Sequence, residues 1–205
     1  MSKVYISYRW QEPIEGIVRN WLCYALANAN VEYSIDVKDC PYKKSIGKYE
    51  EEIGRGESVI IVVSHYYLHS IQCMYEAALI TRTGDLSKRV FPIQIGDYVH
   101  DDRYYVDLCG FWEQKRMEAE ENLAMVNEDQ AIPLRKKLEQ IELILDRLGD
   151  FWDYLSDENF ATFSEVSKDS FAVILEYLKV ERRASIEPIG LSDFEDIDHA
   201  VTEES

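Results

Sequence analysis

A glutamate inside an apolar helical segment is the residue of this sequence best suited to chemistry. Glu76 is followed by four apolar residues, 77–80, and no basic residue comes after it before Arg82. An ion pair one turn along a helix therefore does not explain its position. A carboxylate in apolar surroundings is either held in a cleft, where it serves catalysis, or extends from the helix edge into water. The residue pattern alone leaves both interpretations open.

A basic loop is the second candidate, in a chain that is otherwise acidic. Four lysines lie within eleven residues: Lys38, Lys43, Lys44 and Lys48. They follow a strand-like segment that ends at Asp36, and the loop chemistry of 37–45 includes Pro41. Lysines at the end of a strand attract phosphate groups, but a solvated loop has the same composition. Both interpretations remain open here.

The Tyr8-Arg9-Trp10 run is the third candidate, directly after the first strand-like segment. An arginine between two rings is able to clamp a phosphate and to stack against a base or a pyridine ring. The alternative is structural, with Trp10 covering the core. The remaining signals are weaker, because His65 and His69 lack a patterned carboxylate partner and are expected at the surface. We predict no metal site.

Several reaction classes lack their motifs. The chain has no GxGxxG, no GxxxxGK[ST] and no nucleophile elbow, which disfavours nucleotide kinases and hydride transfer. The four cysteines, Cys23, Cys40, Cys73 and Cys109, form no CxxC pair, and Cys73 is expected to be a small core residue. Reduced thiols and the absence of an apolar leader or an 18-residue apolar stretch predict a cytoplasmic protein with no membrane span.

Alternating strands and helices must position these candidates. Segments 3–8, 31–36, 58–63 and 89–95 have strand composition, and helical patterns at 14–30, 46–53 and 70–82 separate them. This order predicts an α/β fold with an open, doubly wound parallel sheet. Ligands of such sheets bind beyond the carboxyl ends of the strands. We therefore expect the site in four segments: Ser7–Trp10, Asp36–Ser45, Ser64–Ser70 and Gly96–Tyr98.

The second half of the chain is predicted to be helical. Residues 111–126 are charged and helical in pattern, and apolar residues recur at helical spacing in 134–148 and 163–180. Phe151-Trp152 is the candidate for a short fifth strand. We predict one domain over residues 1–183, with core motifs in 1–100 and a helical elaboration in 104–183. Residues 184–205 carry seven acidic and no basic residues and are expected to form a disordered tail.

The net charge of −17 is distributed unevenly. Residues 1–100 carry 12 acidic and 11 basic side chains, so nearly all of the net negative charge lies in the residues after them. The net charge of −17 excludes a uniformly basic nucleic-acid surface. The uneven distribution places any site for a phosphate-bearing ligand in the first hundred residues.

Four ordered segments of residues 1–100 resemble a TIR (Toll/interleukin-1 receptor) domain of the bacterial standalone kind. They are the strand Val4–Tyr8, Asp36 with the following loop, the run Ile53–Ser64, and the pattern Ser64-x-x-Tyr67-Leu68-x-Ser70-x-x-Cys73-x-x-Glu76. The resemblance implies the TIR fold, a flavodoxin-like open parallel sheet, here with an extended helical C-terminal half. In NAD-cleaving members of the family, the glutamate at this place is catalytic. The resemblance therefore also implies a catalytic role for Glu76.

The implied activity is that of an NAD⁺ glycohydrolase or ADP-ribosyl cyclase, with NAD⁺ as the substrate and no resident cofactor. The substrate contacts would come from eight residues: Tyr8, Arg9, Trp10, Asp36, Lys43, Lys44, Ser45 and Ser70. The resemblance further implies self-association through TIR surfaces and antiphage signalling, with a downstream effector that senses the product. Two other functions stay open, a non-enzymatic TIR scaffold and a nucleoside deoxyribosyltransferase-like enzyme. A phosphoacceptor receiver domain is disfavoured, because Ser7 and Tyr8 stand where its acidic pair is expected.

Overall fold

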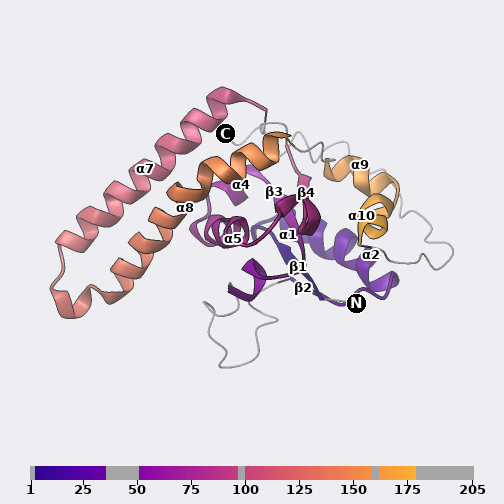
Figure 1. Ribbon diagram of the computed structural model, residues 1–205, viewed down its shortest axis with the longest axis horizontal. Coiled ribbons are helices and arrows are strands. Elements are labelled where there is room, and N and C mark those ends of the chain that lie inside the picture. Colours follow the sequence, from indigo (N-terminus) through magenta and orange to yellow (C-terminus); the bar gives the residue numbers. More distant parts are fainter. Residues whose placement is uncertain (1–2, 36–50, 97–99, 158–161, 179–205) are drawn as a thin grey trace.

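Four parallel strands form an open sheet at the centre of the molecule (Figure 1). The computed structural model describes residues 3–35, 51–96, 100–157 and 162–178. The strand order is β2-β1-β3-β4, and the strands are β1 (Val4–Ser7), β2 (Tyr33–Ser34), β3 (Ser58–Val63) and β4 (Val90–Gln94). The predicted open parallel sheet is therefore confirmed.

Strand β3 forms the centre of the core. Residues 59–63 are 0% exposed, because helices cover both faces of the sheet and strands lie on both sides. In register, Ile60 pairs with Ile6 of β1 and Phe91 of β4. An unbroken apolar run suits this doubly covered position, which explains why the strand was predicted at its observed bounds.

One face of the sheet packs against helices from the two ends of the described chain. From the N-terminal part come α1 (Ile14–Ile17), the π-helical turn η1 (Val18–Leu22) and α2 (Cys23–Asn28); from the C-terminal part come α9 (Phe163–Lys168) and α10 (Ala172–Tyr177). The helix predicted over 163–180 is broken. Ser170 and Phe171 have φ angles of 57° and 61°, and this reversal lets Phe171 pack edge-on against Phe163.

The opposite face packs against the helices that follow β3 and β4. These are α4 (His65–Leu68), α5 (Ile71–Thr81), α7 (Asp102–Ala124) and α8 (Ile132–Asp157); α6 (Leu86–Arg89) and the 3₁₀ turn η3 (Glu128–Gln130) connect elements. The fifth strand predicted at Phe151-Trp152 is wrong, since both residues lie in α8. They continue its buried stripe of Ile141, Ile144 and Leu148, whose period is helical.

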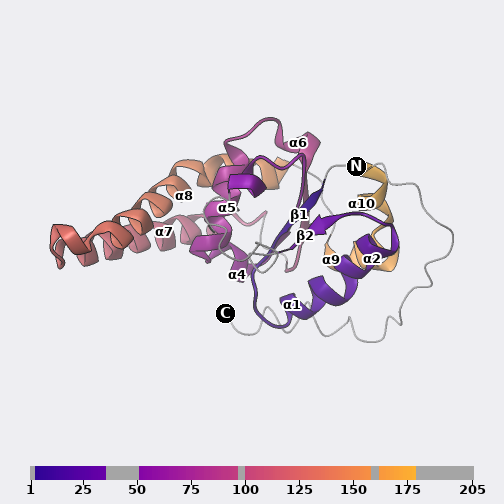
Figure 2. The same ribbon diagram turned by 90° about the horizontal axis from the view of Figure 1, so that it is seen from below.

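Helices α7 and α8 form a long antiparallel hairpin that projects from the sheet (Figures 1 and 2). The predicted helices 111–126 and 134–148 identified this pair but were too short at most of their ends. The inner part of α8 carries the buried residues Ile144, Leu148 and Leu155, which pack in the core beside α5. None of the described helices is both long and apolar enough to span a membrane.

Candidate functional site

Glu76 lies in the middle of α5 and is only 7% exposed. The helix begins after Ser70, whose side chain accepts a hydrogen bond from the Cys73 backbone N–H at 3.4 Å. This capping interaction satisfies one of the first amides of the helix and fixes where α5 begins. The Glu76 side chain is thus buried and does not extend from the helix edge into water.

A chain of hydrogen bonds holds the Glu76 carboxylate. Ser7 Oγ, at the end of β1, donates to Glu76 Oε2 at 2.7 Å, and the Tyr67 hydroxyl lies 2.9 Å from Ser7 Oγ. Because the single hydroxyl proton of Ser7 goes to the carboxylate, Tyr67 donates to Ser7. Ser7 is 1% exposed and Tyr67 is 0% exposed. The carboxylate is therefore oriented by two buried hydroxyls in series.

Two further contacts join the end of β1 to the start of α5. Cys73 Sγ donates to the Tyr8 carbonyl oxygen at 3.7 Å, and Arg9 Nη1 donates to Ser70 Oγ at 3.3 Å. Burial and the nearby Glu76 carboxylate raise the pKa of the Cys73 thiol to about 12. The thiol is thus protonated at neutral pH, which argues against a nucleophilic role and agrees with its expected place in the core.

The site lies at the carboxyl ends of β1 and β3. Ser7 is the last residue of β1, and Ser64 follows β3 and caps α4 by accepting a hydrogen bond from Tyr67 N at 3.1 Å. Parallel α/β sheets bind ligands at this edge. Two of the segments predicted for the site, Ser7–Trp10 and Ser64–Ser70, thus meet around Glu76.

The predicted substrate contacts fall into three groups. Arg9 and Ser70 touch each other at the start of α5, as described above. Tyr8 is 3% exposed and belongs to the core under α1, whereas Trp10 is 37% exposed. The other four, Asp36, Lys43, Lys44 and Ser45, lie outside the described residues, so the loop side of the site stays a prediction.

Two residues of the site had no assigned role in the sequence. Ser7 and Tyr67 occur in the segments that resemble a TIR domain, but Ser7 contacts Glu76 across 69 positions of the chain and Tyr67 contacts Ser7 across 60. A strand-end serine has no local signal that names its partner, since such pairings depend on the tertiary fold. The sequence pattern located the segments, and the structure identifies the hydrogen-bond chain between them.

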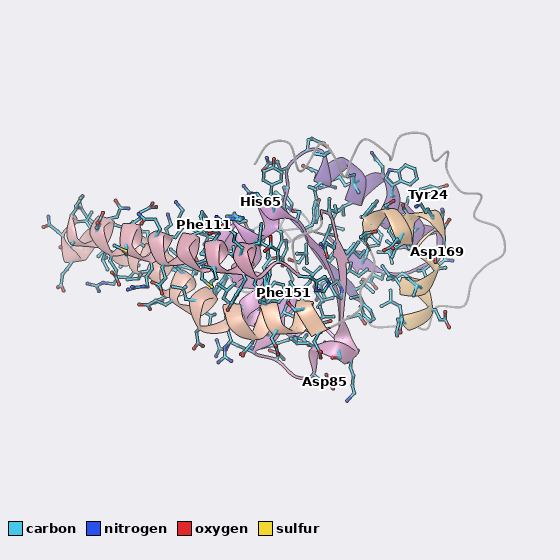
Figure 3. The ribbon with its side chains drawn as sticks, turned by 90° about the horizontal axis from the view of Figure 1, so that it is seen from above. Tyr24, His65, Asp85, Phe111, Phe151 and Asp169 are labelled. Carbon is cyan, nitrogen blue, oxygen red and sulfur yellow. The ribbon has the colours of Figure 1, made fainter. Side chains whose placement is uncertain are left out.

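A cluster of aromatic and histidine side chains adjoins this site where α4 meets α7. His65 and His69 stack with ring centroids 4.1 Å apart; His65 Nδ1 lies 2.9 Å from the Tyr104 hydroxyl, and His69 packs against Phe111 at 4.5 Å. Figure 3 labels His65 and Phe111, which lie near each other at this junction. The sequence predicted both histidines at the surface, and the structure shows them half-buried instead.

This cluster predicts a loss of stability in mild acid. Burial lowers the pKa of both histidines, and the neighbouring ring of His69 lowers that of His65 further. In the unfolded chain the two imidazoles bind protons near pH 6.5, whereas in the folded chain they bind protons only at a lower pH. Stability should therefore decrease as the pH falls below about 6.5, and the decrease should end once the pH is below the lowered pKa values of the folded state. The melting temperature should fall more between pH 7.5 and 5.5 in the wild type than in His65→Gln/His69→Gln.

His100, which is exposed, supplies the matched control for this comparison. His100→Gln should keep the wild-type pH dependence, because it leaves the stacked pair of His65 and His69 intact. Equal slopes in the wild type and the double variant would contradict the assignment.

Comparisons with known proteins identify the family and agree with the fold. A family model described as "TIR domain" matches residues 4–123, which is more than half of the chain. Among solved structures, the TIR domains of the activated Roq1 resistosome, which directly recognises the pathogen effector XopQ, match with a TM-score of 0.54 and 19% identity. The match covers 87% of this chain and 99% of that one, and at this identity it supports the fold alone. No curated protein matches. The chain belongs to the TIR domain family.

Proposed function

We propose that this TIR domain is an enzyme that cleaves the bond between nicotinamide and ribose in NAD⁺. The observation that carries the proposal is the buried Glu76 carboxylate, oriented by Ser7 at the ligand-binding edge of a parallel sheet. Membership of a family that includes NAD-cleaving enzymes supports it. The nearly neutral first hundred residues also suit a substrate that bears phosphates.

The reaction needs stabilisation of positive charge on the ribose. The C1′–N bond breaks, and its electron pair leaves with the nicotinamide nitrogen, which neutralises the pyridinium. The ribose then has the character of an oxocarbenium ion, which a carboxylate beside it stabilises. A water molecule adds its oxygen to C1′ and releases a proton, which gives ADP-ribose. An internal nucleophile in place of water gives a cyclic isomer.

Among the described residues, Arg9 is the one best suited to bind the phosphates of NAD⁺. Its guanidinium lies beside Ser70 at the start of α5, within the same group of contacts as Glu76. An arginine binds phosphate oxygens through charge-assisted hydrogen bonds. In this proposal Arg9 orients the diphosphate, while the exposed ring of Trp10 offers a stacking surface.

A test of the activity is incubation of the concentrated protein with NAD⁺, followed by chromatography. The expected products are nicotinamide together with either ADP-ribose or a cyclic isomer, in equal amounts. Base exchange on nucleosides without NAD⁺ cleavage would instead favour the deoxyribosyltransferase-like alternative. The proposal extends to self-association of copies and to a product that serves antiphage signalling through a separate effector.

A non-enzymatic scaffold is the second candidate function. The observation that favours it is the burial of Glu76, since a well-paired carboxylate also serves to fasten α5 to β1. The two functions differ in one result. A scaffold binds partner TIR surfaces and releases no nicotinamide in any state of assembly.

The Ser7 hydroxyl should contribute measurably to the proposed activity. Ser7→Ala removes the donor at 2.7 Å from Glu76 and leaves the carboxylate without this orienting bond. We expect the rate of nicotinamide release to fall by about 10-fold or more, which corresponds to about 1.4 kcal/mol of activation free energy. Tyr67→Phe, which acts one bond further away, should have the same direction and a smaller effect.

The matched control is Ser87→Ala, at an exposed position of α6. It should leave the rate within about 2-fold of the wild type, since it touches no part of the site. If Ser7→Ala matched this control, the hydrogen-bond chain would have no part in catalysis.

A further inference from the structure

A cavity of about 380 Å³ lies between segment 51–55 and α5, and neither Glu76 nor Ser7 lines it. This volume is within the range of small-molecule pockets. Its lining residues come from those two elements and the turn after α5: Glu51, Gly54, Arg55, Tyr75, Leu79, Arg82 and Thr83. The site proposed for NAD⁺ uses none of these residues.

The cavity has one wall suited to a flat ring. Tyr75, Leu79 and Arg82 follow one another at spacings of four and three along α5, so they share one face of the helix. Gly54 lets the facing segment approach closely, because a Cβ at this position would lie 3.0 Å from the Leu79 Cβ. Tyr75 and Leu79 thus supply an aromatic and an aliphatic surface on α5, and the backbone at Gly54 lies close to Leu79.

The other feature of the cavity is its positive charge. Arg55 and Arg82 both line it, and the carboxylate that lines it belongs to Glu51. Glu51 lies 3.8 Å from Arg55 with both side chains more than half exposed, and such a pair is weak. Among the described residues, no carboxylate forms a salt bridge with Arg82. Two arginines against one glutamate stand out in a chain with a net charge of −17.

We propose that this cavity binds a small phosphate ester that carries a flat ring and has the size of a nucleoside monophosphate. The phosphate would lie between the guanidinium groups of Arg55 and Arg82, which donate charge-assisted hydrogen bonds to its oxygens. The ring would lie against Tyr75 and Leu79. The inference does not rest on the proposed NAD⁺ cleavage, since the cavity and the Glu76–Ser7 contact share no residue.

The experiment is a titration of the ¹⁵N-labelled full chain with AMP, with the amide signals of Gly54 and Thr83 as local reporters. In the wild type these signals should shift and saturate at one AMP per chain. Arg55→Ala/Arg82→Ala should weaken the affinity by at least 10-fold, because both phosphate contacts are lost. Adenosine, which lacks the phosphate, should bind at least 10-fold more weakly than AMP, and Tyr75→Leu should weaken AMP more than inorganic phosphate.

Arg103→Ala/Arg135→Ala is the matched control, since it removes two exposed arginines from the α7–α8 hairpin and keeps the same change in net charge. Its affinity for AMP should stay within 2-fold of the wild type. Three results would overturn the proposal: shifts at Gly54 and Thr83 that never saturate, equal affinity in the Arg55→Ala/Arg82→Ala variant, or equal affinity for adenosine and AMP. Melting curves establish that each variant is folded, which is expected because the arginines replaced are exposed.

Discussion

Replacing Glu76 by glutamine should lower the rate of nicotinamide release from NAD⁺ by about 1,000-fold or more. Glutamine has nearly the same shape, and its amide oxygen is still able to accept the hydrogen bond from Ser7 Oγ. The change therefore removes the negative charge and little else. A charge this well buried is poorly screened by water, so its effect on a developing cation is large.

The expected magnitude corresponds to about 4 kcal/mol of transition-state stabilisation. Initial rates measured by chromatography, with melting temperatures compared, separate this loss from unfolding. Glu142→Gln is the matched control, because Glu142 is exposed on α8 and the same charge is removed. Its rate should equal that of the wild type. A Glu76→Gln protein that is folded and retains its rate would assign the catalytic role elsewhere.

Replacing Trp112 by alanine should destabilise the protein by about 3 to 5 kcal/mol, the range for a buried aromatic residue. Trp112 is 0% exposed, and its indole Nε1–H donates to the Leu68 carbonyl oxygen at 3.1 Å. It thus fastens α7 to the end of α4, next to Tyr67. Because Tyr67 donates to Ser7, loosening of this contact should also reach the site that holds Glu76.

Urea denaturation measures the effect as a lower midpoint of unfolding. Trp112→Phe keeps most of the packing and loses the hydrogen bond, so its effect should be intermediate. Met117→Ala, which truncates a residue that is 49% exposed on the same helix, should change the free energy of unfolding by about 0.5 kcal/mol or less. Equal midpoints for Trp112→Ala and Met117→Ala would show that the hairpin does not depend on this contact.

The elements that were predicted well are those with a strong local period. Strand β3 is apolar after its first residue, Ser58, and was located at its observed bounds, and α5 was predicted one residue too long at each end. In contrast, Phe151-Trp152 read as a strand because two large apolar residues stand side by side. The longer stripe from Ile141 to Leu155 places them in a helix. The break after α9 depends on the left-handed backbone of Phe171, and the sequence has no glycine at this position to indicate such a conformation.

The candidate site was predicted in part. The family pattern pointed to Glu76, and the fold brings Arg9, just after β1, into contact with Ser70 at the start of α5. The partner of the carboxylate was not predicted, because the Ser7–Glu76 contact spans 69 positions of the chain and leaves no local periodicity. The charge distribution also bears on both proposed sites, since Arg9 of the proposed NAD⁺ site and the cavity residues Arg55 and Arg82 all lie in the nearly neutral first hundred residues.

The most direct test of the central claim is a time course of nicotinamide release from NAD⁺, measured on the wild type and on Glu76→Gln at the same high protein concentration. The claim predicts steady release by the wild type, and release by the variant that does not exceed that of NAD⁺ in buffer. Equal release by the two folded proteins, or no release by the wild type in any assembled state, would contradict it.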